Sequence, residues 1–522
     1  MAEYKSTVGK NLLKILMFNM YPEPQIIYRE YVQNALDSIN EAVRQGVLVK
    51  VKDGNISITI NKSKRQIVLE DNGKGIVSDE VAKKLLNIAD SYKDGISSAG
   101  QFGIGRLVGA GYCKNLVFET SALGEGKKSK IEIDVDFVDQ ILRDSNDHSS
   151  ANEVMDTVTK QSVSEEDPDA HYFRVVLNDI KPTYDVLLDE EAVVEYLQEV
   201  APIDYSMPFK NRFINSAPAE FKALHDKIPA VSISINKKSD IRKCYGLKVE
   251  GTGDPIEGLE YFTINDSKYG DLAWGWFALT KFTTQIPASD KNKGLRLRKH
   301  NIQIGDGALL NSFFSEARGN YYFYGEVHVL HDGIEPDSSR SGLAPTPESE
   351  KLKNLLKAEF VNLKNLYVLA NRAKNVVKTV TELTKKADDQ SYPKEQRETS
   401  KNNIETEQAK FVKLEDKAQA SSSSSKLVEL YKKDLENINA PKEGGPKPQS
   451  KKSEPKIDEQ PTAPPKVIDI FAPLKGVLSD KEAFVVRRVF KSLTDNCPEQ
   501  NKKLLEELKI MVIKDLTKAN GR

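Results

Sequence analysis

The sequence predicts an α+β protein: an N-terminal α/β sandwich, a second α/β domain and a long helical region that contains a disordered linker. Three observations support this fold class. Helical periodicity and short β-rich runs alternate over residues 1–180 and again over 181–346, and beyond residue 346 the periodicity is almost purely helical. At 522 residues the chain is also longer than one hydrophobic core usually supports. We therefore expect several folding units in series.

The expected elements of the first domain, residues 1–180, begin with two helical segments, LLKILMF and residues 24–43. NISITI and RQIVLED are β-rich runs separated by NKSK, a pattern that predicts a hairpin. NLVFET, KIEIDVDF and YFRVVLN predict further strands. A connection rich in Gly, Ser, Ala and Lys spans residues 73–111, and connections of this length are usually functional.

The rest of the chain divides by composition. In the second domain, residues 181–346, strands are expected at AVSISI, GLRLRKHNIQIG and YFYGEVHVL. Residues 347–440 have helical spacing with Lys-rich outer faces, interrupted by ASSSSSK. Residues 441–466 are too rich in Pro, Lys and Gly to bury a core, so we expect a disordered linker there. A small helical module is expected at residues 467–522.

Composition excludes several classes of protein. The 76 basic residues nearly cancel the 77 acidic ones, which gives no global reason to expect nucleic acid or anionic lipid as a partner. Cys113, Cys244 and Cys497 are far apart, so neither a disulfide framework nor a zinc site is expected. No segment approaches the ~20 apolar residues of a membrane span, and no secretory leader is evident. We expect a cytoplasmic protein with no membrane partner.

Three polar motifs suggest a binding site. In YREYVQNALDS, Glu30, Asn34 and Asp37 share one face of a helix, which taken alone could be its solvated side. In IVLEDNGKGI, the carboxylate of Asp71 ends a strand, where it can accept a hydrogen bond from an exocyclic amine. Gly73 follows it at alternate spacing with a further glycine, so the backbone can turn sharply beside a flat ligand, although DNGKG is also an ordinary turn.

The third motif is AGQFGIGRLVGAG, in which Gly100, Gly103 and Gly105 precede an apolar helical run. Such a loop presents backbone N–H groups and a positive helix end to phosphates. It is not a P-loop, because G-x-x-x-x-G-K-[ST] occurs nowhere in the chain. It is not a dinucleotide fingerprint either, because Val108 occupies the position of the third glycine.

In order and spacing the three motifs resemble the nucleotide site of the GHKL ATPases, which have the Bergerat fold. The residues of the motifs are most similar to those of the ninety-kilodalton heat-shock chaperone and MORC-type branch. The resemblance implies that residues 1–180 form a GHKL sandwich, that residues 181–346 form a transducer-like middle domain, and that ATP and Mg²⁺ are bound. Glu30 would be the general base, Asn34 the Mg²⁺ ligand and Asp37 a supporting residue, while Asp71 would accept the adenine amine beside Gly75.

The remaining implied contacts surround the phosphates and the base. The implied nucleotide-binding residues are Gly73 and Ile76 near adenine and Gly100, Gln101, Phe102, Gly103, Ile104 and Gly105 near the phosphates. The loop from residue 76 to 100 would be the lid over ATP. One departure is that many relatives begin the last strand of this domain with Gly-Thr, whereas PDAHYFRVVLND contains no such pair.

A cation from the second domain should reach the γ-phosphate in such ATPases. The loose resemblance of EPDSSRS to a motif of the chaperone middle domain suggests Arg340 for this role, with Arg298 and Lys299 as alternatives. An Arg suits it because it stays charged and grips phosphate oxygens with a planar fork. The competing interpretation is an Arg on a surface turn, since EPDSS is itself a good turn sequence.

The resemblance implies an ATPase that acts as a conformational clamp, with lid closure, a homodimer and protein clients. An alternative is a MORC-like or MutL-like ATPase that acts on nucleic acid, because residues 351–386 and 442–466 are Lys-rich. A histidine kinase fits poorly because none of the six histidines lies on a helix ahead of the site. A binding module without catalysis is also disfavoured, because Glu30 is retained.

Overall fold

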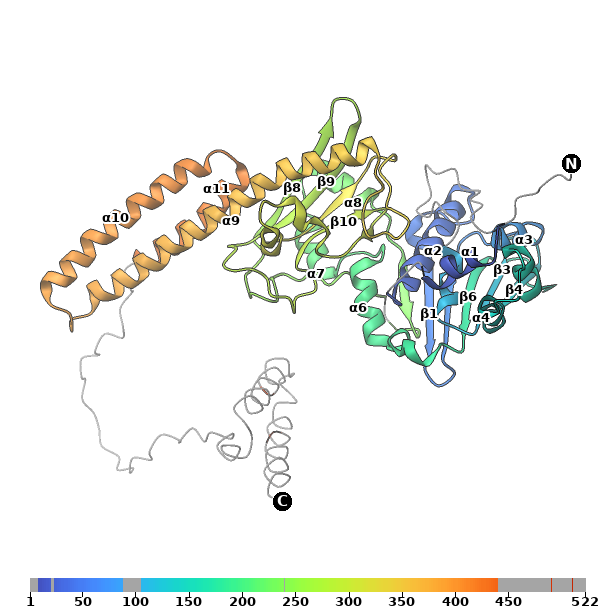
Figure 1. Cartoon of the computed structure of the whole chain (residues 1–522). Coiled ribbons are helices and arrows are strands. Elements are labelled where there is room, and N and C mark those ends of the chain that lie inside the picture. The colour runs from blue at the N-terminus through green and yellow to red at the C-terminus, as the bar shows by residue number, and fades with distance from the viewer. Residues whose placement is uncertain are drawn as a thin grey trace, which may run out of the picture. The chain divides into compact units, whose positions relative to one another are not determined.

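The computed structural model describes residues 8–19, 23–87, 105–238 and 240–439, together with Phe490 and Lys509. The chain divides into two compact units, Met1–Pro441 and Lys442–Arg522. Both sheets and the three long C-terminal helices belong to the first unit (Figure 1). Except for Phe490 and Lys509, the predicted linker and the predicted C-terminal module lie outside the described residues.

The first sheet has seven strands in the order β5-β4-β3-β6-β2-β1-β7. Neighbouring strands are antiparallel except β1 and β7, which are parallel. The strands are β1 (Asn55–Asn61), β2 (Gln66–Asp71), β3 (Asn115–Ser121), β4 (Lys127–Asp134), β5 (Thr159–Glu165), β6 (Tyr172–Asn178) and β7 (Ser232–Ile235). The predicted hairpin is confirmed: β1 and β2 pair across NKSK, where Asn61 Oδ1 accepts a hydrogen bond from the backbone N–H of Lys64 at 3.0 Å.

Strand β7 lies in the AVSISI segment, which was expected in the second domain. In the structure its residues pair with β1, from Asn55 opposite Ser232 to Ile58 opposite Ile235. The outer edge of β1 needs hydrogen-bond partners, and this later segment supplies them. The first sheet therefore includes a strand from beyond residue 180.

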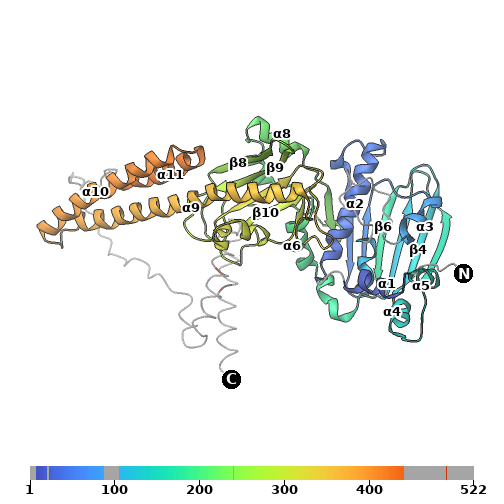
Figure 2. The same ribbon diagram turned by 45° about the horizontal axis from the view of Figure 1, so that its top comes forward.

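Helices pack on the first sheet and complete its core. Figure 2 shows α2 (Ile26–Arg44) running beside the strands, and its apolar residues join the inward side chains of β1 and β2 in one buried cluster. The other helical segments here are α1 (Asn11–Lys14), η1 (Ile15–Asn19), η2 (Val51–Asp53), α3 (Ser78–Leu86), η3 (Gly105–Gly111), α4 (Val135–Arg143), α5 (Ala151–Val158), η4 (Pro182–Leu188) and α6 (Glu190–Val200).

The second sheet has five strands in the order β11-β10-β12-β9-β8. They are β8 (Gly258–Asp266), β9 (Gly270–Leu279), β10 (Gly294–Lys299), β11 (Ile302–Ile304) and β12 (Tyr324–Val329). Every residue of β10 and β12 is buried, as expected for central strands covered on both faces. Two helical segments, η6 (Leu309–Phe313) and η7 (Ala317–Tyr322), lie between β11 and β12. Three others, α7 (Met207–Phe209), η5 (Lys210–Ile214) and α8 (Ala219–Lys227), precede β7 in the chain.

The predicted helical region is confirmed as α9 (Pro347–Asp388), α10 (Lys394–Ala418) and α11 (Ser422–Asn439). Helix α9 begins with Pro at its first position and with Thr346 Oγ1 accepting a hydrogen bond from the N–H of Ser349 at 3.2 Å. Apolar residues of all three helices join the buried cluster of the second sheet, so the two regions share one core. Tyr431 fixes α11 there by donating to the carbonyl of Lys281 at 2.6 Å. In the described part of the chain no helix is long and apolar enough to span a membrane.

Candidate nucleotide site

The start of α2 is buried on all sides. Residues 26–33, IIYREYVQ, have low exposure throughout, and Glu30 is only 6% exposed although it carries a carboxylate. A solvated helix face would leave such a side chain in water, because burying a charge is costly unless it is paired. The structure therefore excludes the solvated-face interpretation for Glu30.

The carboxylate of Glu30 lies between a second-domain cation and a glycine. Arg340 Nε is 3.1 Å from Glu30 Oε1, and Arg29 Nε is 3.9 Å from the same oxygen. Within the described residues Glu30 Oε1 accepts no aligned hydrogen bond, so its contact with Arg340 is chiefly electrostatic. A methyl group on Gly105 would lie 2.7 Å from Glu30 Oε2. A side chain at Gly105 would therefore displace the carboxylate.

Tyr31 holds the end of the glycine-rich motif against α2. Its hydroxyl accepts a hydrogen bond from the N–H of Gly109 at 3.0 Å and donates one to the carbonyl of Arg106 at 3.1 Å. Both partners belong to η3, which begins at Gly105. The first and third motifs, about 75 residues apart, thus meet beside Glu30.

Asp71 is a buried carboxylate at the end of β2, with 4% exposure. Its Oδ1 accepts a hydrogen bond from the N–H of Gly73 at 2.9 Å, and Ser38 of α2 also hydrogen-bonds to it. Burial raises the pKa of Asp71 to about 7, and these two hydrogen bonds only partly oppose that rise. The carboxylate is therefore poised to gain from a further donor such as an amine.

The backbone after Asp71 turns sharply against the ends of β3 and β6. Gly75 has φ +67°, and a methyl group there would lie 2.7 Å from the carbonyl carbon of Ser121 and closer still to its oxygen. The N–H of Ile76 donates to Thr120 Oγ1 at 2.9 Å. Only glycine suits position 75, because both the backbone conformation and the neighbouring atoms exclude a side chain there.

The strand beside Asp71 lacks the Gly-Thr pair, as noted from the sequence. In the β2–β6 register the residue opposite Asp71 is Phe173. Two residues earlier, His171 Nδ1 lies 2.8 Å from the carbonyl oxygen of Gly73. An aromatic ring therefore occupies the register position beside the buried carboxylate, and an imidazole supports the glycine turn.

The Arg340 loop is built as a turn, and its side chain still reaches α2. Arg340 has φ +57°, its N–H donates to the carbonyl of Asp337 at 3.0 Å, and its own carbonyl accepts from Gly305 at 2.8 Å. The carboxylate of Asp337 also accepts from the N–H of Ser341 at 3.1 Å. The turn and the ion pair with Glu30 thus coexist, because the turn is what presents the side chain.

The two alternative cations are occupied inside the second domain. Arg298 Nε donates to Glu326 Oε1 at 2.7 Å, and its Nη2 donates to a backbone carbonyl at 2.8 Å. Lys299 Nζ donates to Glu335 Oε1 at 2.9 Å and to three backbone carbonyls. Both side chains are almost fully buried in these contacts. Among the described residues of the second domain, Arg340 is the cation that contacts Glu30.

Comparison with known proteins agrees with this geometry. Residues 24–164 match the family described as histidine kinase-, DNA gyrase B- and HSP90-like ATPase. The N-terminal part of this chain therefore forms a GHKL-type α/β sheet domain. The fold class and the resemblance inferred from the three motifs are thereby confirmed for this region.

The chain is also similar, over part of its length, to curated chaperones. Chaperone protein HtpG of Chlorobium phaeovibrioides is 30% identical over 144 residues, which cover 24% of this chain and 23% of that protein. HtpG of Halalkalibacterium halodurans is 29% identical over 138 residues, with 24% and 22% covered. HtpG of Nitrobacter winogradskyi is 32% identical over 120 residues, with 20% and 19% covered. The chain thus matches about a fifth to a quarter of the length of these relatives.

Other predicted residues of the GHKL domain lie on the same elements or outside the described residues. Asn34 and Asp37 are partly exposed on α2, and Asp37 lies near enough to His300 of the second domain to oppose the burial that lowers the pKa of that imidazole. The predicted phosphate residues Gly100, Gln101, Phe102, Gly103 and Ile104 lie outside the described residues. The predicted lid includes helix α3, and its residues 88–100 also lie outside.

Two further contacts of the GHKL domain were not predicted from the sequence. Tyr31 anchors η3 and Ser38 contacts Asp71. Tyr31 and Ser38 are seven residues apart on α2, and Asn34 lies between them. The helical period therefore places all three side chains on one face of the helix. This spacing was the available signal in YREYVQNALDS.

Proposed function

We propose that the chain is an ATP-binding and ATP-hydrolysing conformational clamp of the heat-shock-chaperone type, in which nucleotide closes the lid and two copies associate. The single observation that supports it most is the ion pair between Glu30 of the GHKL domain and Arg340 of the second domain. It links the carboxylate suited to activate water with a cation suited to sense phosphate.

The residues present fit ATP and Mg²⁺. Asp71 can accept the adenine amine, and the glycines at 73 and 75 leave the turn beside it without side chains. The phosphates would lie at residues 100–105, where η3 begins beside Glu30. Among the described residues no cluster of three or more His, Cys, Asp or Glu could hold a metal. That suits Mg²⁺, which would be held by Asn34 and phosphate oxygens and would neutralise the phosphate charge.

Hydrolysis would then use two groups of this chain. The carboxylate of Glu30 accepts the proton of the attacking water, and Arg340 moves from Glu30 to the γ-phosphate oxygens. The move is favourable because a phosphate offers more negative charge and a bidentate geometry to a guanidinium. It also releases Glu30 as a base, so catalysis and the position of the second domain become coupled.

ATP turnover by wild type and Glu30→Ala tests the catalytic part of this proposal. Loss of the base is expected to lower kcat by about 10²–10⁴-fold while leaving nucleotide affinity within a few fold. Glu165→Ala is the control, because Glu165 is an exposed glutamate of β5 in the same domain. Equal turnover by all three proteins would refute Glu30 as the base. Absence of any ATP-dependent change in hydrogen exchange at residues 76–87 would refute lid closure.

A nucleic-acid-binding ATPase remains the second candidate, because α9 contains nine Lys and Arg against five Asp and Glu. Part of this charge is already engaged: Lys351 pairs with Asp266 at 2.9 Å, and Lys374 donates to the carbonyl of Thr283 at 2.7 Å. Binding to nucleic acid through such a helix would weaken steeply with salt. A gel shift at low salt that detects no complex would remove this candidate.

A further inference from the structure

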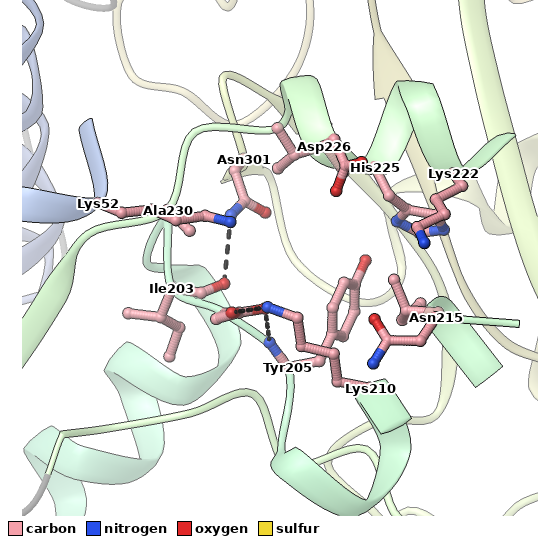
Figure 3. A pocket seen from close by; sticks show the side chains of 13 residues that line it. Lys52, Ile203, Tyr205, Lys210, Asn215, Lys222, His225, Asp226, Ala230 and Asn301 are labelled. Carbon is pink, nitrogen blue, oxygen red and sulfur yellow. Dashed lines mark hydrogen bonds and ion pairs between the residues drawn. The ribbon is translucent and has the colours of Figure 1, made fainter. Parts of the chain in front are cut away.

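A small pocket lies where the second domain meets η2 of the GHKL domain, away from the nucleotide site (Figure 3). Its volume is about 40 Å³, enough for a few water molecules or one compact polar group. Helix α8 contributes Lys222, His225 and Asp226, which are spaced so that they share a face, while Lys210 and Asn215 lie across from them. The pocket is therefore lined mostly by polar side chains.

His225 is the unusual member of the lining. It is 8% exposed, and within the described residues neither of its ring nitrogens has a hydrogen-bond partner. Its ring stands edge-on to Trp274 at 4.8 Å and to Tyr205 at 5.9 Å between centroids. Leaving a buried polar atom unpaired is costly, so a native structure rarely does so without a reason.

The protonation state of His225 limits which ligands could form hydrogen bonds with its ring nitrogens. Burial is the largest cause that lowers its pKa to about 3, and the nearby His328 acts in the same direction. The imidazole is therefore neutral near pH 7, with one N–H to donate and one lone pair to accept. A ligand with a strong acceptor atom would satisfy the donor.

The charges around the pocket favour an anion. Lys52 and Lys222 are exposed at its rim, and neither has an ion-pair partner within the part of the chain that the structure describes. Asp204 is already neutralised, because it pairs with Lys210 and lies 3.5 Å from Arg242. The remaining lysines thus outnumber the remaining acid of the lining, Asp226.

We propose that this pocket binds a small oxyanion, either a phosphate or a carboxylate group. The N–H of His225 donates to one oxygen at the buried end, and Lys222 and Lys52 neutralise the charge at the rim. Lys52 lies in η2 of the GHKL domain, whereas Lys222 lies in α8, so the anion bridges two regions of the first unit. Charge-assisted hydrogen bonds of this kind are stronger than neutral ones.

The test is a thermal-shift titration of the full chain with inorganic phosphate and, in parallel, sodium acetate, each at constant ionic strength set with NaCl. A ligand that binds only the folded state raises the unfolding midpoint saturably. A saturable shift with phosphate or with acetate supports the site and identifies the group that it prefers. No saturable shift with either overturns the proposal.

Three variants assign the shift to this pocket. His225→Phe keeps a ring and removes both nitrogens, so the apparent affinity should fall at least about tenfold without a lower midpoint in the absence of ligand. Lys222→Gln should weaken binding about two- to fivefold, as expected for an exposed cation. Lys227→Gln is the matched control, an exposed lysine of α8 outside the pocket. If His225→Phe binds as wild type does, the shift arises elsewhere and the proposal is wrong.

Discussion

Replacing Gly75 by Ala should disturb the nucleotide turn more than the same change at a glycine of equal conformation. Gly75 and Gly124 have φ values of +67° and +82°, so alanine is strained at both, by about 1 kcal/mol. At Gly124 a new methyl group would meet nothing within 4 Å. At Gly75 it would lie 2.7 Å from the carbonyl carbon of Ser121 and 3.1 Å from the carbonyl oxygen of Tyr172.

Relief of that contact requires the ends of β3 and β6 to move, because both neighbours are backbone atoms. Forcing extra volume into such a site adds about 1–3 kcal/mol. We therefore expect Gly75→Ala to lose about 2–4 kcal/mol of unfolding free energy and Gly124→Ala about 1 kcal/mol. Thermal and urea unfolding of both variants measures the difference, and fluorescent ATP-analogue binding should weaken only for Gly75→Ala. Equal losses in the two variants would refute the close packing of this turn.

Three further predictions concern charged groups. Burial raises the pKa of Asp71 from 3.8 to about 7, so the folded protein without nucleotide should lose up to about 4 kcal/mol of unfolding free energy as the pH rises from about 4 to about 7. Asp71→Asn should abolish this pH dependence in unfolding curves. Arg340→Ala should lower ATP turnover and lower the free energy of unfolding by about 3 kcal/mol in chemical denaturation, because it breaks a buried ion pair. Arg318→Ala breaks an exposed ion pair and should cost under about 1 kcal/mol, so similar losses in the two variants would contradict this reasoning. Glu326→Gln should lower the free energy of unfolding by about 3–5 kcal/mol, because the buried side chains of Lys243 and Arg298 lose their counter-charge. Glu316→Gln on the surface should cause no such loss, and an unfolding midpoint of Glu326→Gln equal to that of wild type would contradict the prediction.

The Glu326 cluster of the last prediction contains one of the two alternative cations, Arg298, whereas Lys299 pairs separately with Glu335. Burial opposes the ionisation of Glu326, but Arg298 and Lys243 hold its pKa well below the ordinary value. The alternation of basic and apolar residues in GLRLRK resembles a strand with an exposed charged face. In the structure both faces of β10 are buried, so its basic side chains form ion pairs inside the protein.

The sequence by itself determined part of the secondary structure and the motifs of this protein. The hairpin of β1 and β2, the helix that carries Glu30 and the long helix α9 follow from period, turn residues and caps, which are local properties of the chain. The three motifs indicated a GHKL domain because their residue types and order are specific in combination. The first inference depends on residues close together in the sequence, and the second depends on the order of three short motifs along it.

Only the tertiary structure decided which distant groups meet. The strand at residues 232–235 joins the first sheet rather than the second, because pairing depends on which edge is available and not on strand propensity. Likewise, the pairing of Arg340 with Glu30 and the burial of Arg298 with Glu326 depend on chain packing over hundreds or tens of residues. A sequence pattern shows that a cation is present, but its partner is set by the three-dimensional distance and the dielectric around it.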